Sequence, residues 1–328
     1  MEFGLKRSTF RLVCYADNCE DIMMRNLFKK TTSLLIVATI VITLASSTVH
    51  DIYAMSSNSS NLPEAKSTIL GENVVGNSLA TIDYSNLSEG YIFVSYNGGT
   101  NKPIKVQILK NGRTTGWQGH GYLYRINNHG VPEQLVLSEG NGTYTVNVFR
   151  HANGAHFNLI FSTTFNVTLR HELAPFLYPN KYVNFTLNGA VSALAATLAE
   201  ENYADTVRRI FRYVSGNISY NWALVSQGVP SWYEPNLEEL LETRLGICFD
   251  FASLMTALLR LNGIPAKMVF GYFEGDSWHA WVNVYLPEYG WLLLDPTKNI
   301  GDSRIVVASM SSRRPALENV SFDAVQFF

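Results

Sequence analysis

Three residues in the C-terminal part of the sequence carry groups that could together perform nucleophilic chemistry. They are Cys248, His279 and Asp295, and they occur in that order. A cysteine nucleophile needs a sulfur, a base that ionises it, and an acid that orients the base. Aromatic residues flank the histidine and precede the aspartate. The sequence therefore holds the parts of a catalytic cysteine site.

The residues around Cys248 predict a thiol at the first turn of a helix. We expect this helix to run from Cys248 to Leu261 and to end at Asn262-Gly263. A helix N-terminus presents unpaired backbone N–H groups and the positive end of the helix dipole, and both favour an anion. A thiol there ionises readily. The backbone N–H of Cys248 is also a candidate hydrogen-bond donor to an oxyanion.

The other two residues belong to a predicted antiparallel sheet with strands at Ala266–Phe273, Trp278–Leu286 and Trp291–Leu294. Across a four-residue loop, Asp295 would lie opposite Val282, on the face of the strand that points away from His279. We therefore predict an odd-length loop or a β-bulge that brings Asp295 to the side of His279.

Helical periodicity precedes this sheet. We expect helices over Ala190–Glu200, Asp205–Val214 and Leu237–Thr243, the last capped by Asn236. Helices followed by an antiparallel sheet make this part of the chain α+β.

Before residue 170 the sequence alternates short apolar runs with turn residues. Asn-Gly pairs or similar turns follow most of the runs, for example at Asn97-Gly98 and Asn111-Gly112. This spacing predicts an all-β sandwich that precedes the α+β domain. His151 and His156 flank one of the turns, and we interpret them as ordinary turn residues. The expected domains are an N-terminal extension with a signal or anchor (1–55), a linker (56–66), the sandwich (67–172) and the α+β domain (173–328).

The N-terminal extension has the pattern of a secretory signal. Basic residues at 25–30 precede an apolar run at 34–44, and small residues follow. This pattern predicts a secreted or cell-surface protein, and an uncleaved segment is the one route to membrane attachment. Cys14 and Cys19 precede the signal, so the exported portion would hold Cys248 as its single cysteine, as expected for a reactive thiol.

Composition limits the classes of partner. The 328-residue chain is 47% hydrophobic and 16% charged, which suits globular cores, and its formal net charge is −2. A net charge this close to zero gives no electrostatic reason to expect a nucleic acid as binding partner. No His, Cys and carboxylate residues occur at metal-ligand spacing, so we expect neither a metal nor a cofactor.

The three motifs together resemble the transglutaminase-like superfamily, which is papain-like in fold. The matching positions are Gly246-x-Cys248-x-Asp250, Trp278-His279-Ala-Trp281 and Gly290-Trp291-x3-Asp295-Pro-Thr. The resemblance covers about residues 181–300. It implies Cys248 as the nucleophile, His279 as the general base and Asp295 as the residue that orients the imidazole. In layout alone, the preceding sandwich is similar to the Ig-like modules of secreted bacterial proteins.

The resemblance implies acyl transfer from an amide of a peptide or protein through a thioester. We expect hydrolysis in preference to protein crosslinking, because water needs no dedicated second site. The substrate would be a protein or peptide, and one candidate is a substrate associated with the cell wall. The alternative is a catalytically silent surface scaffold, in which the old site survives as packing.

Several neighbours of the motif residues have open roles. Asp250 is expected to orient or cap the start of the helix. Tyr220 and Trp222 are equal candidates for a side-chain donor to the oxyanion. Trp278 and Trp281 could line a cleft, but packing within the sheet explains them as well.

Overall fold

The computed structural model of the chain describes residues 71–112, 121–127, 129–273, 277–297, 308–309 and 322–328. All of them belong to one compact unit, residues 55–328. The predicted signal and linker lie outside the described residues. Within the described part of the chain, no helix is both long and apolar enough to cross a membrane.

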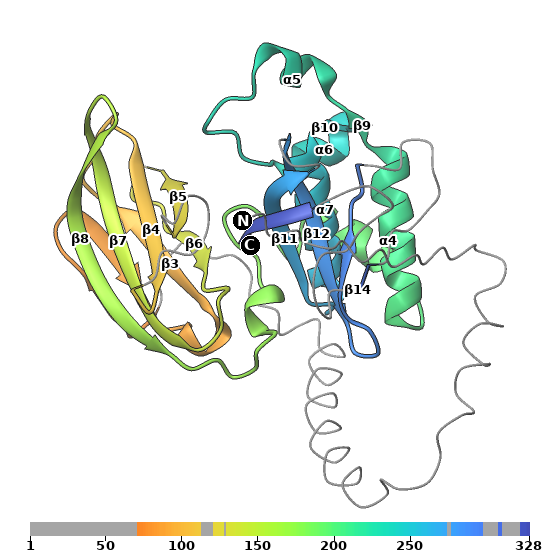
Figure 1. Cartoon of the computed structure of the whole chain (residues 1–328), viewed down its shortest axis with the longest axis horizontal. Coiled ribbons are helices and arrows are strands. Elements are labelled where there is room, and N and C mark those ends of the chain that lie inside the picture. Colours follow the sequence, from red (N-terminus) through yellow and green to blue (C-terminus); the bar gives the residue numbers. More distant parts are fainter. Residues whose placement is uncertain (1–70, 113–120, 128, 274–276, 298–307, 310–321) are drawn as a thin grey trace, which may run out of the picture. The chain divides into compact units, whose positions relative to one another are not determined.

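The first part of the unit is built from two four-stranded antiparallel sheets (Figure 1). One sheet has the order β1-β2-β3-β6, and its strands are β1 (Val74–Gly76), β2 (Ala80–Asp83), β3 (Tyr91–Tyr96) and β6 (Glu133–Val136). The other has the order β5-β4-β7-β8, and its strands are β5 (Tyr122–Ile126), β4 (Ile104–Lys110), β7 (Gly142–Asn153) and β8 (His156–Val167). The predicted all-β region is therefore confirmed, whereas its Ig-like character stays a prediction.

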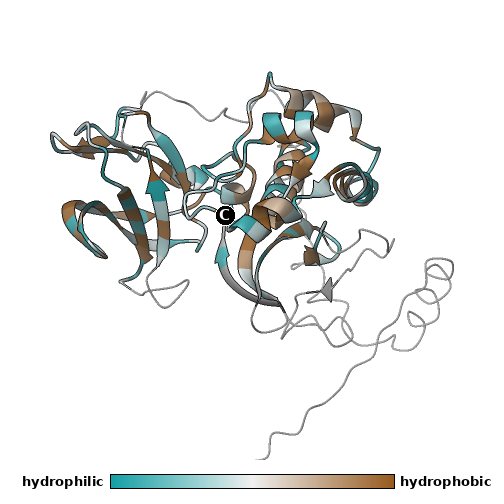
Figure 2. Cartoon of the chain, turned by 90° about the horizontal axis from the view of Figure 1, so that it is seen from above, coloured by the Kyte–Doolittle hydropathy of each residue, from teal (hydrophilic) through white to brown (hydrophobic). Residues whose placement is uncertain are grey.

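The inward faces of the two sheets share one core. Ile82 and Val94 from one sheet belong to the same buried cluster as Val106 and Val146 from the other. Because side chains alternate between the faces of a strand, the period-two sequence of β4 puts its apolar residues inward and its polar ones outward. Figure 2 shows the resulting alternation of hydrophobic and hydrophilic residues along the strands. Strand β3 is buried on both faces, and Tyr91 and Phe93 on its outer face join a second cluster with Leu177 and Tyr178.

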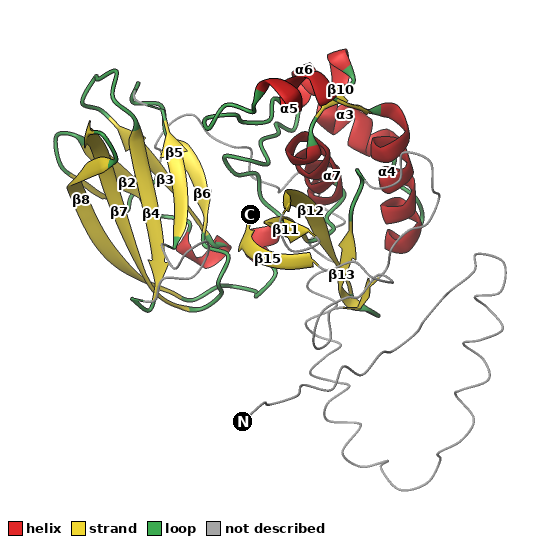
Figure 3. Cartoon of the chain, turned by 45° about the horizontal axis from the view of Figure 1, so that its top comes forward, coloured by secondary structure: helices red, strands yellow, loops and turns green. Residues whose placement is uncertain are grey.

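The second part of the unit surrounds one buried helix, α7 (Cys248–Leu261). The other regular elements of this part that precede α7 are the helices α3 (Ala190–Thr197), α4 (Tyr203–Asn217), α5 (Trp222–Gln227) and α6 (Leu237–Thr243), the short strands β9 (Ser219–Tyr220) and β10 (Leu245–Gly246), and the 3-10 turn η4 (Ala174–Phe176). Another 3-10 turn, η2 (Leu87–Glu89), lies in the first part, between β2 and β3. Figure 3 shows α7 beside the sheet strands that follow it. A helix buried on all sides needs a largely apolar sequence, and α7 has one.

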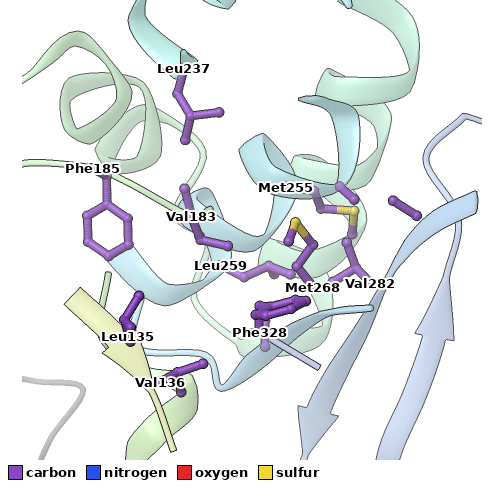
Figure 4. Packing of buried hydrophobic residues seen from close by; sticks show 14 of the residues in the cluster. Leu135, Val136, Val183, Phe185, Leu237, Met255, Leu259, Met268, Val282 and Phe328 are labelled. Carbon is purple, nitrogen blue, oxygen red and sulfur yellow. The ribbon is translucent and has the colours of Figure 1, made fainter. Parts of the chain in front are cut away.

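A five-stranded antiparallel sheet, in the order β14-β13-β12-β11-β15, packs against α7. Its strands are β11 (Ala266–Phe273), β12 (Ser277–Leu286), β13 (Gly290–Leu294), β14 (Ala308–Ser309) and β15 (Phe322–Phe327). Met268 and Val282 from this sheet join Met255 and Leu259 of α7 in the core (Figure 4). The arrangement confirms the predicted α+β class.

Polar groups on α7 are satisfied inside this core. Arg260 is fully buried and donates hydrogen bonds to the backbone oxygens of Tyr178, Ala266 and Phe328, at 2.6, 2.8 and 2.8 Å. Burial lowers the pKa of Arg260 to about 9. Three carbonyl dipoles thus replace the water that the guanidinium loses on burial.

The core extends from α7 into the first sheet. Leu135 and Val136 of β6 belong to the same buried cluster as Val183 and Phe185, which precede α3 (Figure 4). Phe328 packs edge-on against Tyr124 of β5, with ring centroids 5.4 Å apart. The strands of the first part and the helices of the second therefore share one continuous core.

Candidate active site

Cys248 is the first residue of α7, and the residue before it is extended, with φ −105° and ψ 179° at Ile247. The thiol is half-buried and forms no disulfide. Its predicted helix, with the stop at Asn262-Gly263, is confirmed to the residue: Asn262 is the C-cap, and Gly263 follows at φ +69°. The sulfur thus lies where backbone N–H groups leave a helix without intrahelical partners.

Asp250 fixes the start of this helix. One of its carboxylate oxygens accepts hydrogen bonds from the backbone N–H of Ile247 and from the hydroxyl of Tyr233, both at 2.7 Å. The side chain is 2% exposed. Burial raises the pKa of Asp250, and the two hydrogen bonds oppose that rise. The expected structural role of Asp250 is confirmed, and Tyr233 is a supporting residue that the sequence did not reveal.

Gly246 leaves room for that carboxylate. A Cβ atom at this position would lie 2.7 Å from Cβ of Asp250 and 2.8 Å from Cδ1 of Leu240. Such contacts are too short for carbon atoms, so any side chain would push the helix start away from α6. The glycine two residues before Cys248 is therefore required by packing.

His279 and Asp295 meet across the β12–β13 hairpin. Nε2 of His279 lies 2.8 Å from Oδ2 of Asp295, and the two side chains are 13% and 3% exposed. Leu286 pairs with Gly290 and Val282 with Leu294, so the connecting loop has three residues. This odd-length loop is the one that the sequence predicts, and it places Asp295 on the face that carries His279.

Thr297 holds the other oxygen of Asp295. Its backbone N–H and its hydroxyl both donate to Oδ1, at 3.0 and 2.6 Å. The same hydroxyl oxygen lies 3.3 Å from Nε2 of His279. The Asp-Pro-Thr turn therefore fixes the carboxylate in one orientation toward the imidazole, as an Asx-type turn does. Sequence analysis recorded the motif but did not assign this role to Thr297.

His279 also lies close enough to Cys248 for the two side chains to interact. Since Nε2 faces Asp295, Nδ1 is the ring nitrogen left for the sulfur. Burial lowers the pKa of His279, but the hydrogen bonds and charges of Asp295 and Cys248 outweigh it and raise the pKa to about 9. The structure thus brings the three predicted residues together, in a setting that favours an imidazolium beside the sulfur.

Tyr220 reaches Cys248 from a separate segment. A short parallel bridge pairs Tyr220 of β9 with Gly246 of β10, and the N–H of Asn221 donates to the carbonyl of Gly246 at 2.8 Å. The Tyr220 hydroxyl lies close to the backbone N–H and the side chain of Cys248. Burial, followed by the charge of Cys248, raises the pKa of Tyr220 to about 12, so the phenol keeps its proton at neutral pH.

Trp222 takes a different place from Tyr220. Its side chain is 71% exposed, and its ring lies 4.5 Å from the ring of Tyr220. Of the two candidate donors to an oxyanion, Tyr220 is therefore the one in contact with the cysteine.

The two tryptophans of the histidine motif also differ. Trp281 is 1% exposed and lies beneath His279, with ring centroids 6.4 Å apart. Trp278 is 46% exposed and stacks on Phe270 at 5.8 Å. Trp281 therefore supports the imidazole from within the fold, whereas Trp278 presents an aromatic surface to solvent.

No group of three or more His, Cys, Asp or Glu side chains within the described residues is arranged to hold a metal ion.

Comparison with known proteins shows what the region that carries this site is similar to. Residues 192–296 match the family model of the transglutaminase-like superfamily. The chain is 28% identical to the uncharacterized protein YebA of Bacillus subtilis (strain 168) over 202 residues, which are 51% of this chain and 27% of YebA. It is 39% identical over 79 residues to the protein-glutamine gamma-glutamyltransferase of Pseudomonas aeruginosa, covering 20% of this chain and 12% of that protein.

Among the solved structures to which the chain is similar is a crystal structure of red sea bream transglutaminase. It is 14% identical to this chain and aligns with a TM-score of 0.29, over 72% of this chain and 51% of that structure. The matched region spans at most about a quarter of the length of the two curated relatives.

Proposed function

We propose that this chain is an acyl-transfer enzyme with Cys248 as its nucleophile, because residues 192–296 match the family model of the transglutaminase-like superfamily. The proposal rests on one observation above all: Nε2 of His279 lies 2.8 Å from Oδ2 of Asp295, and the same imidazole interacts with the side chain of Cys248. This is the arrangement that activates a weak nucleophile and then supplies a proton to the leaving group.

The first half of the reaction forms a thioester. The sulfur of Cys248 attacks the carbonyl carbon of an amide, and the C–O π electrons move to the oxygen. The imidazolium of His279 then gives its proton to the leaving nitrogen, the C–N bond breaks and an amine departs. Asp295 keeps the ring oriented and stabilises its positive charge, while the hydrogen bonds from Thr297 keep the carboxylate in place.

The second half returns the thiol. Neutral His279 takes a proton from water, the hydroxide attacks the thioester carbon, and the C–S bond breaks. The products are a carboxylic acid and Cys248, which recovers its ion pair with the protonated imidazole. An amine in place of water would give an isopeptide crosslink by the same steps. We favour water, since crosslinking also needs a path for the amine and exclusion of water.

We propose two groups as hydrogen-bond donors to the oxyanion. The backbone N–H of Cys248 points from the end of α7, and the hydroxyl of Tyr220 contacts the same residue. A donor at this position is effective because it is oriented before the charge develops. We assign both as oxyanion donors within the proposed mechanism.

The place of action is part of the proposal. The pattern of residues 25–54 is typical of a secretory signal. We therefore propose a secreted or cell-surface enzyme that acts on peptides or proteins outside the cell.

The test is to offer both kinds of acceptor at once. The chain is incubated with casein as glutamine donor and with a labelled primary amine, and label incorporation, ammonia and new peptide ends are measured together. The proposal expects release of ammonia or peptides that is lost in Cys248→Ala, with little label on casein. Efficient label incorporation would establish crosslinking instead. Absence of every product across a panel of protein donors would contradict an acyl-transfer enzyme.

A further inference from the structure

A hollow in the molecule lies away from the thiol. It has a volume of about 510 Å³ and is bounded by β3, the β5–β6 region and the segment after η4, and by the loop that precedes α6. Cys248, His279 and Asp295 are not among the described residues that line it. This volume falls within the range of about 300–1,000 Å³ that small-molecule sites occupy.

Two buried amide groups line this cavity without a hydrogen-bond partner among the described residues: Nδ2 of Asn180 and Nε2 of Gln134. Oδ1 of Asn180 accepts from the backbone N–H groups of Tyr182 and Val183 at 3.0 and 3.1 Å, so the free end is the NH₂ group. Asn180 is 2% and Gln134 4% exposed. Buried donors without partners are costly, so these two call for acceptor atoms from a ligand.

The charges around the cavity favour an anion. The amine of Lys181 bonds to both carboxylates of the lining, Glu133 and Glu234, and this group of three keeps one negative charge. Lys102 and Arg125 also line the cavity, so the lining has three positive charges and two negative ones, a net charge of +1. Glu133 also accepts hydrogen bonds from Asn127. Arg125 faces the cavity as a further cation, and its guanidinium lies 5.6 Å from the ring centroid of Trp232.

We propose that this cavity binds a carboxylate-bearing ligand of about dipeptide size. The carboxylate would accept hydrogen bonds from the amide groups of Asn180 and Gln134, with Arg125 supplying the countercharge. Trp232, which is 62% exposed, would cover the uncharged part of the ligand. This assignment concerns binding and does not depend on the proposed acyl transfer.

The cavity adjoins the segment that supports the thiol. Trp232 and Glu234 line it, while Tyr233 between them donates to Asp250 at the start of α7. A peptide that reaches the cavity would therefore bind next to the elements that carry Cys248. Binding of an acidic peptide in preference to free carboxylates would identify the ligand as part of a polypeptide.

The test is calorimetric titration of the full chain with acetyl-Ala-Glu-Ala-amide, with the matched Gln peptide, and with free glutamate and glucuronate. We expect the Glu peptide to bind at least tenfold more tightly than the Gln peptide. Tighter binding of the Glu peptide than of the free carboxylates would point to a peptide ligand, and the reverse order to a small acid. Equal binding of the Glu and Gln peptides, or no binding by any acidic probe, would overturn the proposal.

Two isosteric variants locate the binding. Asn180→Asp keeps the oxygen that accepts from the backbone but turns the free donor into an acceptor, and Gln134→Glu makes the same change. Each should weaken binding of the acidic probe at least tenfold, whereas Asn217→Asp, a similar change at an exposed site outside the cavity lining, should not. If either variant is unstable, Trp232→Ala at the exposed rim provides the comparison. Unchanged affinity in the folded cavity variants would contradict the assignment.

Discussion

Oδ2 of Asp295 lies 2.8 Å from Nε2 of His279, and the two residues reach each other because a three-residue loop joins β12 to β13. The other oxygen of Asp295 accepts two hydrogen bonds from Thr297. The carboxylate is thus fixed on both sides, and it holds the ring so that its second nitrogen is left for Cys248.

Asp295→Asn should retain the hairpin and lose most of the activity. The amide is isosteric but uncharged, so it no longer stabilises the imidazolium or enforces the tautomer that presents a nitrogen to the sulfur. In a comparable triad the same change costs about 10⁴-fold in kcat. We expect a loss of 10²-fold or more in the release assay, with an unchanged circular dichroism spectrum. Near-normal turnover would show that Asp295 does not orient the base.

The pH profile should have its alkaline limb near the pKa of His279. That pKa is raised from its ordinary value of 6.5 to about 9, so the imidazolium that gives its proton to the leaving group persists to that pH. We therefore expect kcat/KM to decline as the pH rises through about 9. Protonated His279 should also stabilise the fold, because its pKa is higher in the folded chain than in the unfolded one. This contribution to the free energy of unfolding is complete below pH 6.5 and is lost as the pH rises through the folded-state pKa of about 9. In Asp295→Asn the alkaline limb of the kcat/KM profile should move to lower pH. If it does not move, the limb reports the titration of a group other than His279.

Tyr220→Phe should reduce turnover without unfolding the chain. The ring still packs on Trp222 and only the hydroxyl at Cys248 is lost. Removal of one oxyanion donor costs about 10²–10³-fold in kcat, and we expect the lower end because the backbone N–H remains. Trp222→Phe is the matched control, since that side chain is exposed, and it should keep more than half of the activity. Equal rates for the two variants would remove Tyr220 from the mechanism.

Two helix caps should differ in what they affect. Asp250→Ala leaves the N–H of Ile247 and the hydroxyl of Tyr233 without their partner, and Asn236→Ala removes the cap of α6. Each should lower the free energy of unfolding by about 1 kcal/mol or more, as lost caps do, and urea denaturation measures this. Only Asp250→Ala should also slow the alkylation of Cys248, because only α7 carries the thiol. An unchanged alkylation rate in a folded Asp250→Ala variant would show that the cap of α7 does not affect the reactivity of Cys248.

Arg260→Met should strongly destabilise the fold. The substitution preserves most of the side-chain length but leaves the buried carbonyl oxygens of Tyr178 and Ala266 without the guanidinium that donates to them, whereas the carbonyl of Phe328 keeps the N–H of Met268. With about 1–3 kcal/mol for each unsatisfied buried group, we expect a loss of more than about 2 kcal/mol. Thermal unfolding measures it, with Arg212→Met on the exposed side of α4 as the control. A loss below about 1 kcal/mol would mean that the packing around α7 compensates for the missing bonds.

Local patterns predicted the elements that carry the site. The limits of α7 followed from a buried apolar stripe and an Asn-Gly stop, and the odd-length loop followed from the side on which Asp295 had to lie. These features depend on neighbouring residues and on strand periodicity, which a single sequence displays.

Contacts between distant segments could not be predicted in the same way. Tyr220 reaches Cys248 through a two-residue parallel bridge, which is too short to produce a periodic pattern. The edge contact of Phe328 with Tyr124 joins residues far apart in the sequence. The helix α5 was also missed, since its six residues include exposed Trp222 and Val225 and show no buried stripe. Such features depend on the assembled fold and leave little trace in local composition.

The most direct test of the catalytic site is the pH dependence of Cys248 alkylation by iodoacetamide, with the modified residue located by peptide mapping, since the chain also contains Cys14 and Cys19. At pH 6 the rate at Cys248 should exceed that of free cysteine by at least tenfold in the native chain, and it should fall to the free-cysteine rate or below in His279→Ala. A rate at pH 6 no faster than free cysteine, or one that His279→Ala leaves unchanged, would contradict a thiolate paired with this imidazole.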